Sequence, residues 1–102
     1  MKVNIDKLEK ILREQTNLDI KLIQCHKNLI CIDTNIVYPN GDFCSIHIQR
    51  IDEITVRIID DSNCVIKKLP LGFKIHDNKI YMDTPIETLG SSLLKFVGFI
   101  SN

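Results

Sequence analysis

Apolar residues recur at every second position in several short segments of the sequence, which is the pattern of a half-buried β-strand. The pattern is clearest at Leu18, Ile20 and Leu22, at Cys44, Ile46 and Ile48, and at Ile54, Val56 and Ile58. A further run at residues 29–38 is rich in Ile and Val. Because turn-forming residues separate these segments, we predict four strands in an antiparallel meander.

Three turns punctuate the predicted strands. Pro39-Asn40-Gly41-Asp42 combines a fixed φ with residues that tolerate positive φ, and Asp52-Glu53 forms a charged turn. Asp77-Asn78 separates residues 73–76 from residues 79–82 and predicts a further hairpin. Asp60-Asp61-Ser62-Asn63 ends the fourth strand, and each of these residues can cap a helix, so residues 63–69 fit either a short helix or another strand.

A helix is predicted at each end of the chain. Asn4 is a suitable N-cap, Ile5, Leu8, Ile11 and Leu12 share one helical face, and Asn17 is a suitable left-handed stop. Near the C-terminus, Thr84-Pro85-Ile86-Glu87 has the form of a capping box with Pro at the first helical position. We therefore expect a second helix over residues 85–99.

These elements predict a single α+β domain over residues 1–102, an antiparallel β-meander with a further hairpin packed against an N-terminal and a C-terminal helix. Hydrophobic residues make up 44% of the chain and charged residues 25%, which is typical of a folded domain with a real core. No repeat or low-complexity segment interrupts it.

The charge balance disfavours broad nucleic-acid binding. Lys and Arg number 13, as do Asp and Glu, whereas proteins held by phosphate contacts normally carry a cationic excess. A nucleic-acid-binding or regulatory role requires Lys21, Arg50, Arg57, Lys67 and Lys68 to gather on one side. The first ten residues do not resemble a signal peptide, and no apolar stretch is long enough to span a bilayer. We therefore expect a cytoplasmic protein without a membrane partner.

The four cysteines and the nearby histidines contain the ligand types that zinc prefers. However, Cys44 and His47 lie three residues apart on a predicted strand and should point to opposite faces, as should Cys25 and His26. No C-x-x-C pair is present. We predict reduced, mostly buried thiols with neither a metal, nor another cofactor, nor a Cys–His catalytic dyad.

A metal-dependent nuclease or hydrolase is a further alternative. Asp19 and Lys21 lie on one strand face, and the Asp60-Asp61 pair lies at a strand end. The chemistry requires these groups to converge, whereas the simpler interpretation is a solvated strand face and a turn.

The predicted C-terminal helix has more apolar residues than one core-facing stripe needs. Leu94 and Phe99 fall outside the face formed by Leu89, Leu93 and Phe96. Because a contiguous exposed apolar patch marks a contact site, we predict that Leu94 and Phe99 bind a protein partner or a second copy of the chain. Asp52, Glu53, Asp60 and Asp61 are predicted to form an acidic patch for the same purpose.

The segment from Tyr38 to Leu69 resembles an uncharacterised domain family of short bacterial and phage proteins. The resemblance rests on Tyr38-Pro39-Asn40-Gly41-Asp42, then a strand, and then Ile58-Ile59-Asp60-Asp61 before an apolar segment. It implies a mobile-element setting but no catalytic residues. Abundant Ile and Asn with no Ala fit the AT-rich codons of such genomes.

Together, the sequence predicts a small noncatalytic protein-interaction module that acts by stoichiometric binding. Inhibition of a host enzyme or a defence complex is the role that the mobile-element setting favours. A nucleic-acid-binding module and a small metal-dependent nuclease or hydrolase are the alternatives.

Overall fold

The computed structural model of the chain describes residues 4–34, 36–39, 41–60 and 69–101. It consists of one six-stranded antiparallel sheet and two α-helices. The helices are α1 (Ile5–Thr16) and α2 (Leu89–Ile100), and a short 3-10 helix, η1 (Ile86–Thr88), precedes α2. The strands are β1 (Lys21–His26), β2 (Leu29–Asp33), β3 (Ile46–Arg50), β4 (Thr55–Asp60), β5 (Phe73–His76) and β6 (Lys79–Pro85).

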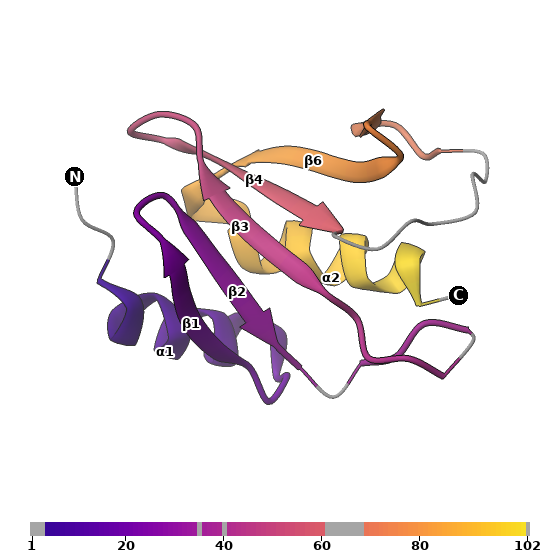
Figure 1. Cartoon of the computed structure of the whole chain (residues 1–102). Coiled ribbons are helices and arrows are strands. Elements are labelled where there is room, and N and C mark those ends of the chain that lie inside the picture. The colour runs from indigo at the N-terminus through magenta and orange to yellow at the C-terminus, as the bar shows by residue number, and fades with distance from the viewer. Residues whose placement is uncertain (1–3, 35, 40, 61–68, 102) are drawn as a thin grey trace.

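The predicted α+β fold is confirmed. The strand order is β1-β2-β3-β4-β6-β5, so the first four strands form the expected meander. The later hairpin joins through β6, which pairs with β4 and leaves β5 at the sheet edge. Both helices cover the same face of the sheet (Figure 1), and α1 packs against β1 while α2 packs against β4 and β6. We call the opposite face, on which the described residues place no helix, the open face.

The alternation in the sequence sets which side chains face the helices. Inward positions of neighbouring strands share one register, as in the row Leu22–Ile32–Ile46 and the row Ile30–Ile48–Ile58. These side chains are buried against apolar residues of the two helices, namely Leu8, Leu12, Leu89, Leu93, Phe96, Val97 and Ile100. A one-residue slip would expose the whole set, so the hydrophobic pattern fixes the register.

The first helix begins and ends where the sequence predicts. The Asn4 side chain accepts a hydrogen bond from the Lys7 amide at 3.1 Å, and Asn17 adopts the left-handed conformation (φ 55°). The Asp77-Asn78 turn is also confirmed, since both residues have positive φ, as a tight hairpin turn requires. The prediction for residues 63–69 lies outside the described residues, apart from Leu69.

The predicted start of the second helix is wrong. Thr84 does not cap a helix but continues β6, pairing with Val56, and Pro85 pairs with Thr55. The Ile86 amide then donates to the Ile54 carbonyl at 2.8 Å, which extends the ladder beyond Pro85. The buried Thr84 hydroxyl lies 2.6 Å from the Ser92 hydroxyl instead of bonding to a first-turn amide. Strand pairing therefore outweighs the local capping signal, and α2 begins at Leu89.

Candidate functional site

The two apolar residues predicted as contacts on the C-terminal helix differ in exposure. Leu94 is 42% exposed, as expected for a residue outside the core stripe. Phe99 is only partly exposed, because the Phe73 ring of β5 lies 4.9 Å from it, centroid to centroid. The β5–β6 hairpin thus covers part of the predicted patch, and the apolar excess of α2 is smaller than the sequence suggested.

The charged turn between β3 and β4 is built around Asp52. Its carboxylate accepts hydrogen bonds from the amides of Ile54 (2.9 Å) and Thr55 (2.8 Å). These bonds, the Ile54 amide first, lower the pKa of Asp52 below its ordinary value, with nearby Arg50 as a smaller cause. Asp52 and Glu53 are both exposed, so an acidic surface exists at this turn, although the Asp52 carboxylate is largely engaged in holding it.

Asp60 does not belong to an exposed acidic patch, and this prediction is wrong. It occupies an inward position of β4, two residues after Ile58, and has no exposed surface. Its carboxylate accepts a hydrogen bond from the Tyr38 hydroxyl, which in turn accepts one from the Ser45 amide at 3.0 Å. The strand alternation turns Asp60 toward the core, where it links β4 to the chain before β3. Asp61 lies outside the described residues.

The inward position of Asp60 also argues against the metal-dependent nuclease. Lys21 lies on β1 at an outward position, whereas Asp60 lies on β4 and faces the helices. Three strand spacings of about 4.8 Å separate these strands, roughly 14 Å in all. One metal ion therefore cannot be shared between Asp60 and the Asp19–Lys21 pair.

The predicted basic set is divided between the two faces of the sheet: Lys21 and Arg57 occupy outward positions, whereas Arg50 has the inward parity of Ile46 and Ile48. Arg57 on the open face is paired with Asp83, with Nε 2.7 Å from Oδ1, and its guanidinium stacks 4.3 Å from the centre of the Tyr81 ring. Arg50 donates instead to the carbonyls of Asp52 and Glu53. Lys67 and Lys68 lie outside the described residues.

The open face carries one row of side chains that crosses the sheet from β1 to β5. The registers place Ile23, Cys31, His47, Ile59, Tyr81 and Lys74 opposite one another in turn. Ile23 is 49% exposed, and Ile59 and Tyr81 are partly exposed. Antiparallel sheets often present a polar face to solvent, so apolar and aromatic side chains at the centre of this row are notable.

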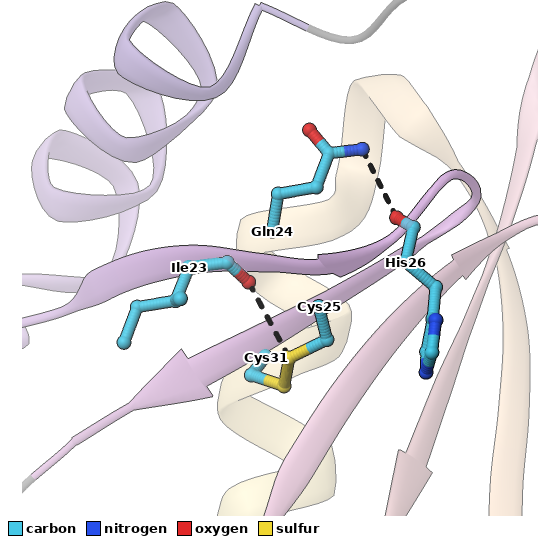
Figure 2. The surroundings of a disulfide bond; sticks show 5 residues. All are labelled: Ile23, Gln24, Cys25, His26 and Cys31. Carbon is cyan, nitrogen blue, oxygen red and sulfur yellow. Dashed lines mark hydrogen bonds between the residues drawn. A yellow bond between two sulfur atoms is a disulfide. The ribbon is translucent and has the colours of Figure 1, made fainter.

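Sulfur and nitrogen ligands gather at the β1–β3 end of this row. Cys25 and Cys31 form a disulfide between β1 and β2, with a Cα–Cα distance of 6.2 Å (Figure 2). His47 lies opposite Cys31 on β3, and one ligand atom from each of the three residues lies within 4.8 Å of the others. The prediction that these two cysteines are buried thiols is therefore wrong, whereas Cys44 is buried as expected.

A β-bulge explains why the sequence analysis missed this cluster. A regular hairpin with His26 opposite Leu29 would put Cys25 opposite Ile30 and turn it toward the core. The observed register instead pairs Gln24 with Ile30, so Cys25 is the extra residue. The bulge brings Leu22 opposite Ile32, both inward, so the hydrophobic pattern was the signal that could have revealed it.

One small pocket lies at the end of the sheet beside α1, lined in part by Leu8, Gln24 and Arg50, with a volume of about 20 Å³. That is about the space of one water molecule. This pocket is therefore too small to enclose a substrate.

None of the described helices is long and apolar enough to cross a membrane. The resemblance of Tyr38–Leu69 to an uncharacterised family stays a prediction, as does the cytoplasmic location. No protein-family model, curated protein or solved structure matches this chain.

Proposed function

We propose that the protein is a noncatalytic binding module that forms a stoichiometric complex with a protein partner through its open face. The observation that carries this proposal is the row of apolar and aromatic side chains, with Ile23, Ile59 and Tyr81 in one register, on a face without a described helix. Apolar surface of this kind in a folded domain is a common mark of a contact site.

The chemistry of the open face suits a protein more than a nucleic acid. Tyr and Arg are the side chains that most often dominate protein interfaces, and here Arg57 and Tyr81 stack on each other. Asp83 neutralises Arg57 and holds the guanidinium in place through two hydrogen bonds, at 2.7 and 3.1 Å. A preorganised pair loses less side-chain entropy on binding, which favours recognition.

A comparison of two charge-introducing variants tests the proposal. Ile59→Lys places a cation at the centre of the open face, whereas Leu94→Lys places one on α2. Tagged protein is expressed in its natural source cells, cross-linked and purified, and the bound protein is identified and quantified. We expect one partner at near 1:1 ratio with the wild type and with Leu94→Lys, and a loss of at least tenfold with Ile59→Lys.

Two outcomes contradict this proposal. Loss of the partner with Leu94→Lys but not with Ile59→Lys would place the interface on α2. Absence of any stoichiometric partner would argue against a binding module altogether. Circular dichroism and thermal unfolding of both variants show whether a loss reflects unfolding.

We further propose that the protein comes from a bacterium or phage and inhibits its partner. The composition and the family resemblance support this source, and the source favours an inhibitory role. If the captured partner is an enzyme of a host or defence complex, adding purified protein should abolish its activity at a 1:1 ratio. Unchanged activity at saturation would leave binding without inhibition and contradict this finer role.

A further inference from the structure

The Cys25–Cys31–His47 cluster has the geometry of a three-ligand metal site. The cysteines lie on adjacent strands, and His47 lies directly opposite Cys31 on the third strand. Tetrahedral zinc with bonds of about 2.0–2.3 Å holds its ligand atoms roughly 3.5 Å apart. Because the three ligand atoms already lie within 4.8 Å of one another, small side-chain rotations would bring them to this spacing once the sulfurs separate.

The disulfide and a metal site use the same two sulfur atoms and therefore exclude each other. A sulfur bonded to its partner in a disulfide lacks the negative charge that makes a thiolate a strong zinc ligand. After reduction, two thiolates and one imidazole form a Cys₂His set, a combination that zinc adopts with its fourth position open. Soft sulfur ligands favour Zn²⁺ over Mg²⁺ or Ca²⁺.

We propose that Cys25, Cys31 and His47 bind one Zn²⁺ ion when the disulfide is reduced, and that re-forming the disulfide releases the ion. The site is therefore a redox-controlled zinc site at one end of the open face. Cys25 is exposed, and Cys31 and His47 are partly exposed, so water can occupy the fourth position and reductants can reach the sulfurs.

The chemical steps balance with a dithiol as the reductant. Reduction transfers two electrons and two protons from the dithiol to the Cys25–Cys31 bond, giving two protein thiols and a disulfide of the reductant. Zinc binding then displaces the two thiol protons. In the reverse direction, a small-molecule disulfide accepts the two electrons, the sulfur–sulfur bond re-forms and Zn²⁺ leaves.

Redox state and metal uptake can be measured on the same full-length protein. The test variant carries Cys44→Ala and Cys64→Ala, so that only the two cysteines of the site remain. If Cys44→Ala prevents folding, Cys64→Ala alone serves, because Cys44 is buried. Co²⁺ is the spectroscopic probe and Zn²⁺ the competitor, both added without oxygen after the reductant has been removed.

We expect the reduced chain to bind one Co²⁺ with thiolate charge-transfer and tetrahedral visible bands that Zn²⁺ abolishes, and the oxidised chain to show neither band. Cys25→Ser, Cys31→Ser and His47→Gln should each weaken Zn²⁺ binding at least tenfold, the loss seen even for outer partners of metal ligands. His26→Gln is the matched control, since His26 neighbours Cys25 but does not belong to the cluster, and should bind as the parent does.

Several results would overturn the proposal. These are absence of metal uptake by the folded, reduced chain, uptake by the oxidised chain, one metal per two chains, and unchanged affinity in Cys31→Ser or His47→Gln. None of them bears on the binding-module proposal, which rests on Ile23, Ile59 and Tyr81.

Discussion

At the scale of single residues, the buried carboxylate of Asp60 gives the most direct prediction. Tyr38→Phe keeps the ring but removes the hydroxyl that donates to Asp60 and accepts from the Ser45 amide. Removing a hydrogen-bond donor from a buried acceptor costs about 1–3 kcal/mol. We expect the free energy of unfolding in urea to fall by this amount. Tyr81→Phe is the control, since its ring contacts Arg57 on the partly exposed face, and it should change stability by less than about 0.5 kcal/mol.

The turn at Asp52 predicts a specific pH dependence of stability. Amide hydrogen bonds lower the pKa of Asp52 in the folded state, so its carboxylate stabilises the fold above the unfolded-state pKa of about 3.9. This contribution is lost as the pH falls through the lower folded-state pKa. Asp52→Asn should therefore flatten the stability profile below about pH 4, as measured by thermal unfolding. Glu53→Gln removes a charge from the same turn without touching these bonds, and an equal flattening would contradict the explanation.

At the scale of elements, α1 and α2 meet at a glycine. The Gly90 amide donates to the Gln15 side-chain oxygen at 3.1 Å, and a Cβ atom added at Gly90 would lie 2.5 Å from the Gln15 Cβ. Gly90→Ala should force the helices apart and cost about 1–3 kcal/mol. Gly98→Ala is its match in the same helix, with open space around the added atom, and should stabilise by about 0.5–1 kcal/mol through helix propensity. Chemical denaturation measures the free energy of unfolding of both variants. Equal changes in the two variants would contradict the explanation that the close contact between the helices at Gly90 excludes a side chain.

Elements whose signals are local and periodic are those that the sequence predicts best. Asn4, Asn17 and the Asp77-Asn78 turn act within a few residues of themselves, and each is confirmed. The prediction that Thr84 caps a helix was wrong because Thr84 pairs with Val56, which lies almost thirty residues earlier in the chain. The bulge at Cys25 was not predicted for a related reason. It arises because the hydrophobic positions of two strands must match, and no residue type at the bulge signals it.

At the scale of the whole molecule, the candidate site depends on topology that no single segment encodes. The predicted meander makes the strands of Cys31 and His47 neighbours, but only the register places the two residues opposite each other, and only the bulge brings Cys25 to them. The burial of Phe99 also depends on topology. The sequence predicted that Phe99 lies outside the core, but β5, at the far edge of the sheet, places Phe73 beside it. Exposure could therefore be predicted where alternation alone decides it, as along β3, and not where a distant hairpin returns to cover a helix.

The hairpin's cover of α2 leads to a prediction about the assembly state. Phe73 stacks on the buried Phe96 ring at 5.6 Å and contacts Phe99, so it joins the sheet edge to the helix. Phe73→Ala should lower the free energy of unfolding by about 3 kcal/mol, the lower end of the range for a core Phe.

The same substitution should uncover Phe99 beside Leu94 and create the contiguous apolar patch that the sequence suggested. Sedimentation of Phe73→Ala should therefore show concentration-dependent self-association. Phe73→Leu, whose side chain still covers most of Phe99, should associate less. Adding Leu94→Lys to Phe73→Ala should reverse it. Phe73→Ala could instead stay folded and associate no more than the wild type. That result would show that the apolar side chains of α2 do not bind a second copy of the chain even when they are exposed. It would contradict self-association through the C-terminal helix.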